Sequence, residues 1–159
     1  MANPGKSSGK ELKISFRKST NEDFDFVFKL NKTNMQKYVE KIRGWDEEAE
    51  RKDMKDKFTA DIDLIIQING EDAGVLRVLE KEGSINLGHI ELLPKFQNQD
   101  VGSKIIEGVI RKNKPVTLQV LKSNPAVELY KRLGFEIMGE TDLKYKMSIQ
   151  VSPKSTVNR

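Results

Sequence analysis

Two segments of the sequence constrain the fold more than any other feature: a strand-to-helix connection at 92–106 and a helix start at 124–135. In the first, an apolar strand runs into a short polar turn and then into a helix. A turn of this kind directs several unpaired backbone N–H groups at one point, where the helix dipole also favours negative charge. In the second, Asn124 is a capping residue, and Tyr130 comes about one turn before the helix ends. The two segments predict alternating strands and helices that bind an anionic ligand and present a phenol near it.

The composition narrows the class of protein. A chain of 159 residues with 36% hydrophobic and 33% charged residues is large enough for one domain with a core. We expect that domain to span 11–151, between a flexible tail at 1–10 and a polar tail at 152–159. The net charge of +4 is scattered rather than clustered, which argues against nucleic acid as a partner.

Several kinds of site are excluded by residue type. The chain has no cysteine and a single histidine, His89, so disulfides, thiolate nucleophiles and metal sites built from Cys or paired His are excluded, and we expect no metal. No apolar run approaches the roughly 18 residues that span a membrane, and the N-terminus lacks the apolar core of a secretory signal. We therefore expect no membrane partner and a cytoplasmic protein.

Hydrophobic periodicity predicts a mixed chain of the α/β (α+β) class. Apolar residues at spacings of three and four indicate helices, alternation and short apolar runs indicate strands, and Asn69-Gly70 indicates a hairpin. A helical segment follows the first strand, before the remaining strands. The expected helices are 20–30, 34–42, 46–58, 101–112 and 124–133, and the expected strands are 12–17, 62–68, 73–79, 84–93, 116–120, 135–139 and 143–151.

Taken singly, both segments also have ordinary interpretations. In the turn, Asn98 and Asp100 tolerate left-handed backbone and Gly102 has no Cβ to block a ligand, yet an unspecialised loop has the same features. Tyr130 lies on an apolar helix stripe, where a tyrosine usually packs in the core. Its phenol, with an ordinary pKa of about 10, is also able to protonate a departing thiolate.

Together, the two segments resemble the GNAT superfamily of N-acetyltransferases. The family's Gln/Arg-x-x-Gly-x-Gly/Ala signature corresponds to 97–102, and its downstream motif, which begins with Asn and ends in Leu-Tyr-x-x-x-Gly-Phe, corresponds to 124–135. The resemblance covers roughly 12–150. It implies a single domain with a mixed, mostly antiparallel sheet of about six or seven strands, flanked by helices.

The resemblance also implies acetyl-coenzyme A as the acetyl donor and direct attack by a primary amine, without a covalent enzyme intermediate. Strands 84–93 and 116–120 would separate and admit the pantetheine arm, which Asn124 would hydrogen-bond. Tyr130 would protonate the leaving thiolate. Backbone N–H groups near Leu92 and Leu93 would bind the thioester carbonyl and the pantetheine, and the pyrophosphate would lie against Gln97, Asn98, Gln99, Asp100, Val101, Gly102, Ser103 and Lys104.

One residue departs from the family's pattern. Asp100 stands where the family has its first Gly, so a carboxylate would lie near the pyrophosphate and weaken its binding unless it faces solvent or pairs with Lys104. This departure keeps a second interpretation open: a catalytically weak module that binds coenzyme A or acyl-coenzyme A, or a protein-interaction module on the same fold. We place the enzyme first.

The acceptor side is inferred from the residues alone. Glu91 is the candidate general base, and His89, on the same strand face, is the alternative or assistant; a surface carboxylate and a packed histidine fit the sequence equally well. Tyr38, Trp45 and Asp46 are the candidate contacts for the amine, although a charged, solvated helix anchored by a tryptophan is favoured for the last two. The expected partner is a small-molecule or peptide amine, and a homodimer is compatible with the sequence.

Overall fold

A seven-stranded sheet forms the centre of the computed structural model, which describes residues 11–150; the tails expected at 1–10 and 152–159 lie outside this range. The strand order is β2-β3-β4-β5-β6-β8-β7, and only β5 and β6 run parallel. The mixed, mostly antiparallel sheet is therefore confirmed. The strands are β2 (Ile14–Lys18), β3 (Leu64–Ile68), β4 (Glu71–Glu80), β5 (Ile85–Leu92), β6 (Val116–Leu121), β7 (Glu136–Glu140) and β8 (Lys144–Ile149).

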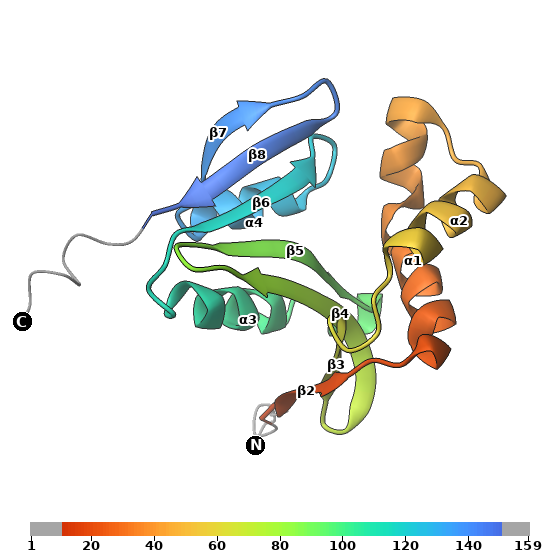
Figure 1. Ribbon diagram of the computed structural model, residues 1–159, viewed down its shortest axis with the longest axis horizontal. Coiled ribbons are helices and arrows are strands. Elements are labelled where there is room, and N and C mark those ends of the chain that lie inside the picture. The colour runs from red at the N-terminus through yellow and green to blue at the C-terminus, as the bar shows by residue number, and fades with distance from the viewer. Residues whose placement is uncertain (1–10, 151–159) are drawn as a thin grey trace, which may run out of the picture.

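Helices cover both faces of the sheet (Figure 1). On one face, α1 packs Val27 and Leu30 against Ile65 and Val75 of the sheet. The other face packs against α3 and α4 in a larger core. Because side chains alternate between the faces of a strand, neighbouring residues of β3 and β4 serve the two cores. The helices are α1 (Phe24–Arg43), α2 (Glu47–Lys57), α3 (Val101–Ile110) and α4 (Ala126–Arg132), with short 3-10 helices η1 (Asn21–Asp23) and η2 (Pro94–Phe96).

The prediction of two separate helices at 20–30 and 34–42 is wrong, because α1 is one helix of 20 residues. A polar stretch interrupts its apolar pattern, but no Gly or Pro lies within it to break the helix. Two of the residues in that stretch, Asn31 and Asn34, make hydrogen bonds to β5. The gap in the apolar pattern therefore marks polar contacts with the sheet rather than a helix boundary.

Strands β5 and β6 separate after a short stretch of pairing. Only Ile85 and Asn86 of β5 pair with β6, at Val116 and Thr117, although both strands continue beyond that point. The register between β5 and β4 shifts just beyond this paired stretch, which places a β-bulge at Gly88. The C-terminal half of β5 therefore faces a gap in the sheet, as the family resemblance implied.

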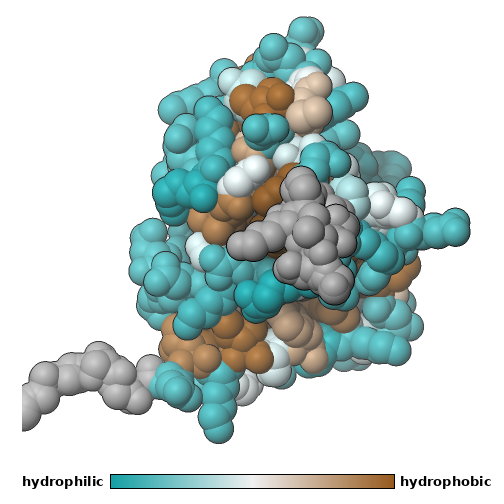
Figure 2. All heavy atoms as spheres, turned by 90° about the vertical axis from the view of Figure 1, so that its left-hand side faces the viewer, coloured by the Kyte–Doolittle hydropathy of each residue, from teal (hydrophilic) through white to brown (hydrophobic). Residues whose placement is uncertain are grey.

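Hydrophilic side chains predominate on the face of the molecule in Figure 2, where hydrophobic side chains form separate areas. No helix within 11–150 combines the length and the apolar character needed to cross a membrane. Over the same residues, no group of three or more His, Asp or Glu side chains is placed to hold a metal ion.

Candidate active site

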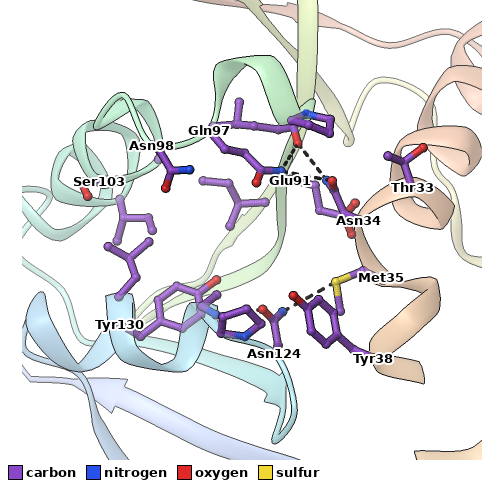
Figure 3. A pocket seen from close by; sticks show the side chains of 18 of the residues that line it. Thr33, Asn34, Met35, Tyr38, Glu91, Gln97, Asn98, Ser103, Asn124 and Tyr130 are labelled. Atoms are coloured by element: carbon purple, nitrogen blue, oxygen red, sulfur yellow. Dashed lines mark hydrogen bonds between the residues drawn. The ribbon is translucent and has the colours of Figure 1, made fainter. Parts of the chain in front are cut away.

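A cavity of about 780 Å³ lies where β5 and β6 separate, with α1 on one side and the starts of α3 and α4 on the other (Figure 3). Most of the residues predicted for the site line it. From the loop and the start of α3 these are Gln97, Asn98, Asp100, Gly102 and Ser103. From the other elements they are Tyr38, Glu91, Leu92, Asn124 and Tyr130.

The loop before α3 has the backbone that the sequence predicted. Asn98 and Asp100 both adopt left-handed conformations, with φ of 63° and 65°. Asp100 is the N-cap of α3, but its carboxylate makes no capping hydrogen bond. The backbone N–H groups at the start of α3 are therefore left for another acceptor, at the positive end of the helix dipole.

Gly102 leaves open space beside this helix start. Apart from its chain neighbours and the nearby backbone of α3, a Cβ at Gly102 would meet no protein atom within 4 Å, and the same holds for Gly108 farther along α3. Gly102 lines the cavity, whereas Gly108 does not. The space at Gly102 can therefore take a ligand that approaches the backbone closely.

Two expected backbone donors are already used within the protein. The Leu93 N–H donates to the Ala73 carbonyl at 2.8 Å, one residue beyond the end of β5. The Lys104 N–H donates to the Asp100 carbonyl at 3.0 Å, which closes the first turn of α3. Leu93 and Lys104, with Gln99 and Val101, also lie outside the cavity lining. These findings narrow the predicted anion-binding donors to the first turn of α3. Of the two predicted backbone positions at the end of β5, only Leu92 lines the cavity.

The Leu92 carbonyl joins three elements of the site (Figure 3). It accepts hydrogen bonds from Asn34 Nδ2 of α1 at 2.8 Å and from Gln97 Nε2 of the loop at 2.9 Å. Gln97 Nε2 also donates to Asn34 Oδ1 at 3.1 Å. The loop, β5 and α1 are thereby held in one arrangement around the cavity. Neither Asn34 nor its neighbour Asn31 was predicted as a site residue; two asparagines three residues apart inside a helix were the available signal.

Glu91 projects from β5 into the cavity, and only one of its two carboxylate oxygens is hydrogen-bonded within the protein. Its Oε2 accepts from Asn31 Nδ2 at 2.6 Å and lies 2.8 Å from His89 Nε2. Its Oε1 is buried and has no hydrogen-bond partner. The side chain is only 10% exposed. A buried, unpartnered carboxylate oxygen is costly to keep, so Oε1 is suited to accept a proton or a donor from a bound molecule.

His89 lies beside Glu91 because the bulge comes before both residues and leaves their alternation intact. Burial alone would lower the pKa of His89, but the hydrogen bond and charge of Glu91 outweigh it and raise that pKa above its ordinary value. Asp63 adds to this rise and Arg77 opposes it. His89 is therefore positively charged beside the Glu91 carboxylate over a wider pH range than an isolated histidine.

Tyr130 faces Glu91 from α4, on the opposite side of the cavity (Figure 3). The residue is 8% exposed, and its ring packs edge-on against Phe135, with 5.7 Å between centroids. Burial, with the negative charge of Glu91, raises the pKa of Tyr130 to about 12. The phenol thus stays protonated at neutral pH and can act only as a proton donor there.

Asn124 and its neighbour connect the β6–α4 loop to α1. The N-cap of α4 is Pro125 rather than Asn124, which the sequence predicted as the capping residue. Asn124 Oδ1 accepts from the N–H of Ala126, the first residue of α4, at 2.9 Å, and Asn124 Nδ2 lies 3.7 Å from Met35 Sδ. Ser123 Oγ donates to the Tyr38 carbonyl at 3.3 Å. These contacts join the β6–α4 loop to α1, and Asn124 lines the cavity.

Trp45 and Asp46 lie outside the cavity lining. Asp46 is the N-cap of α2, where its Oδ1 accepts from the Ala49 N–H at 3.1 Å. Trp45 Nε1 donates to Glu47 Oε1 at 2.9 Å. Both side chains thus have local roles at the α1–α2 junction, and of the predicted acceptor contacts only Tyr38 lines the cavity.

The comparisons with known proteins agree with this geometry. The sequence profile described as "Acetyltransferase (GNAT) domain" matches residues 32–149, well over half of the chain. The chain belongs to the GNAT acetyltransferase family. No curated protein sequence matches it.

Solved structures of GNAT acetyltransferases share the fold at low sequence identity. PaiA N-acetyltransferase from Thermoplasma acidophilum, solved with coenzyme A, superposes with a TM-score of 0.68 at 15% identity, over 87% of this chain and 99% of that chain. The ribosomal-protein-S18-alanine N-acetyltransferase of Escherichia coli gives 0.62 at 18% identity, over 88% and 95%. Arabidopsis thaliana Naa50, in complex with the bisubstrate analogue CoA-Ac-MVNAL, gives 0.56 at 17% identity, over 85% and 97%.

The alignment of the downstream GNAT motif needs one correction. The family places its Asn three residues before its Ala, whereas Asn124 is two residues before Ala126. By that spacing Ser123 occupies the position of the family's Asn. Asn124 is nevertheless the one of the two that lines the cavity. Its assignment as a site residue therefore depends on the structure and not on the motif.

Proposed function

We propose that the chain transfers an acetyl group from acetyl-coenzyme A to a primary amine by direct attack. One observation carries this proposal: the cavity between β5 and β6 holds the free Glu91 carboxylate oxygen and the protonated Tyr130 phenol, next to the open helix start at Gly102. A base for the amine and an acid for the leaving group are the two proton-transfer roles that this reaction needs.

The residues present fit the donor. Backbone N–H groups in the first turn of α3, beside the space at Gly102, would hold the pyrophosphate. The edge of β5 at Leu92, which does not pair with β6, and the Asn124 amide would hold the pantetheine in the gap between the two strands. Acetyl-coenzyme A, when bound, supplies a thioester that an uncharged amine can attack.

Glu91 and Tyr130 divide the proton transfers between them. Asn31 and His89 hold Oε2 of Glu91, so Oε1 is the oxygen that takes the proton from the attacking amine, directly or through a water molecule. Tyr130 gives its proton to the departing sulfur. The amine nitrogen forms the new bond to the acetyl carbon and the carbon–sulfur bond breaks. The proton that Glu91 gains from the amine equals the one that Tyr130 gives to the sulfur, so the net charge of the site is unchanged.

The proposal is tested by an amine screen with the purified protein. Release of free thiol is followed with a panel of peptide, amino acid and polyamine acceptors, and the product is identified by mass spectrometry. Thiol release that depends on the amine, with a product heavier by one acetyl group, supports the proposal. Tight binding of acetyl-coenzyme A with no acetylated product from any amine would favour a binding module instead.

We expect Tyr130→Phe to lower turnover by about 10- to 100-fold while leaving acetyl-coenzyme A binding unchanged. The loss lies at the low end for a general acid because a thiolate is already a good leaving group. Phe keeps the ring that packs on Phe135, so the fold is retained. Steady-state kinetics and calorimetric titration measure the two effects, and unchanged turnover would remove Tyr130 as the acid.

The raised pKa of Tyr130 also sets an expectation for pH dependence. A group with its pKa near 12 remains protonated throughout the range in which an ordinary tyrosine, at 10.0, begins to ionise. Ionisation of Tyr130 should therefore cause no decline in the wild-type rate near pH 10. A decline near pH 10 that Tyr130→Phe abolishes would contradict the raised pKa of Tyr130.

Asp100→Gly should tighten coenzyme A binding by about fivefold at low ionic strength, and less in high salt. The substitution removes a carboxylate from the helix start and places Gly at a φ of 65°, where it carries no Cβ strain. Asp100→Asn is the matched control, because it removes the charge and still tolerates the left-handed backbone. Calorimetric titration of both variants separates charge from backbone; an unchanged dissociation constant in both would place the carboxylate away from the ligand.

A further inference from the structure

A stripe of basic side chains on α1 leads out of the cavity. Together with Thr33, Gln36 and Glu40, the three lysines Lys29, Lys32 and Lys37 line a shallow groove of about 570 Å³, here called the basic groove. Their spacing of three and four places them on one face of α1. Thr33 and Lys37 line both the basic groove and the main cavity. A molecule whose amine lies near Glu91 would therefore continue over this face of the helix.

The positive charge of the basic groove is only partly compensated. Lys32 forms an ion pair with Glu47 at 3.1 Å, and Glu40 accepts from Gln36 at 3.0 Å. Lys29 and Lys37 form no ion pair with any residue within 11–150, although Lys37 Nζ lies 5.1 Å from the centroid of the Tyr38 ring. Two ammonium groups are thus available to an anionic molecule along the exit from the cavity.

We propose that the acceptor is a peptide amine followed by acidic residues, whose carboxylates lie along the basic groove. This inference rests on the proposed acetyl transfer, because the amine must reach Glu91. From Lys29 to Glu40 the helix rises about 16 Å, which matches about five residues of extended peptide. The same lysines repel polyamines and Lys-rich peptides, so charge selects among acceptors that are otherwise alike.

The test compares three peptides that share an N-terminal Ala and differ in the next four residues: all Glu, all Gln or all Lys. Steady-state acetylation gives KM for each, and fluorescence anisotropy of labelled peptides gives their binding to the protein loaded with coenzyme A. We expect KM for the Glu peptide to be about tenfold lower than for the Gln peptide at low salt, and about twofold lower at high salt. The Lys peptide should have the highest KM.

Charge reversal on α1 assigns the effect to the groove. The double variant Lys29→Glu/Lys37→Glu should lose the preference for the Glu peptide and favour the Lys peptide. Lys41→Glu is the matched control, since Lys41 is exposed on the same helix but lines neither the basic groove nor the cavity. It should keep the preference of the wild type.

Failure of this inference is distinguishable from failure of the proposed function. Acetylation of all three peptides with equal KM, or an unaltered preference in the double variant, overturns the inference and leaves acetyl transfer intact. Tighter binding of the Glu peptide without acetylation of any peptide supports the groove and counts against acetyl transfer. Displacement of the Glu peptide by a single-stranded oligonucleotide that binds more tightly assigns the groove to nucleic acid and overturns the inference.

Discussion

Glu91→Gln is expected to lower kcat/KM for a primary amine by about 100-fold or more at neutral pH. The amide has nearly the same shape as the carboxylate and can still accept from Asn31, but it cannot take a proton from the amine. Within 11–150, no protein group is hydrogen-bonded to Oε1 of Glu91. No neighbouring group is therefore in place to accept the proton when the carboxylate is lost. Steady-state kinetics with a saturating donor measure the loss.

The pH dependence makes this prediction sharper. In the variant, the reaction depends on the small fraction of amine that is already uncharged, and that fraction increases with pH. The difference between wild type and Glu91→Gln should therefore shrink as the pH rises toward the pKa of the acceptor. Glu82→Gln, at an exposed carboxylate outside the cavity, is the control and should match the wild type. Equal rates for Glu91→Gln and wild type at neutral pH would mean that another group is the base.

Gly102→Val is expected to weaken acetyl-coenzyme A binding by about 100-fold or more. The side chain would fill space that no protein atom occupies, at the N-terminus of α3 where the pyrophosphate needs close access to backbone N–H groups. Gly102→Ala should give a smaller loss, because only a Cβ is added. Calorimetric titration gives the dissociation constant for each variant.

Gly108 offers a matched control on the same helix. Its Cβ position is also open, but it lies away from the cavity. Alanine at either position should raise the free energy of unfolding by about 0.5–1 kcal/mol, because Gly is a poor helix former. Only Gly102→Ala should weaken donor binding. Equal affinities for the two alanine variants would place the pyrophosphate elsewhere.

Much of the fold is predictable from the sequence because its local signals agree with the tertiary structure. Asn69 and Gly70 both adopt positive φ in the hairpin between β3 and β4, as their residue types predicted. Asn98 and Asp100 likewise have the left-handed backbone expected of them. These residue types alone locate the start of α3, since a turn is specified by residues close in sequence.

The acceptor side was harder to predict because its contacts join residues far apart in the chain. Asn31 and Asn34 reach across 60 and 58 positions to Glu91 and Leu92, and the same polar residues gave the false break in α1. The basic groove was missed for a similar reason. Lysines on a helix are usually solvated. Only the position of these lysines beside the cavity, which the sequence does not show, indicates a role in acceptor binding.

Calorimetric titration with acetyl-coenzyme A, with acetyl-pantetheine alongside, is the most direct test of donor binding at the start of α3. We expect micromolar binding of acetyl-coenzyme A and far weaker binding of acetyl-pantetheine, which lacks the pyrophosphate that the start of α3 would hold. Equal binding of the two compounds, or no binding of acetyl-coenzyme A, would contradict the placement of the donor and, with it, the proposed acetyl transfer.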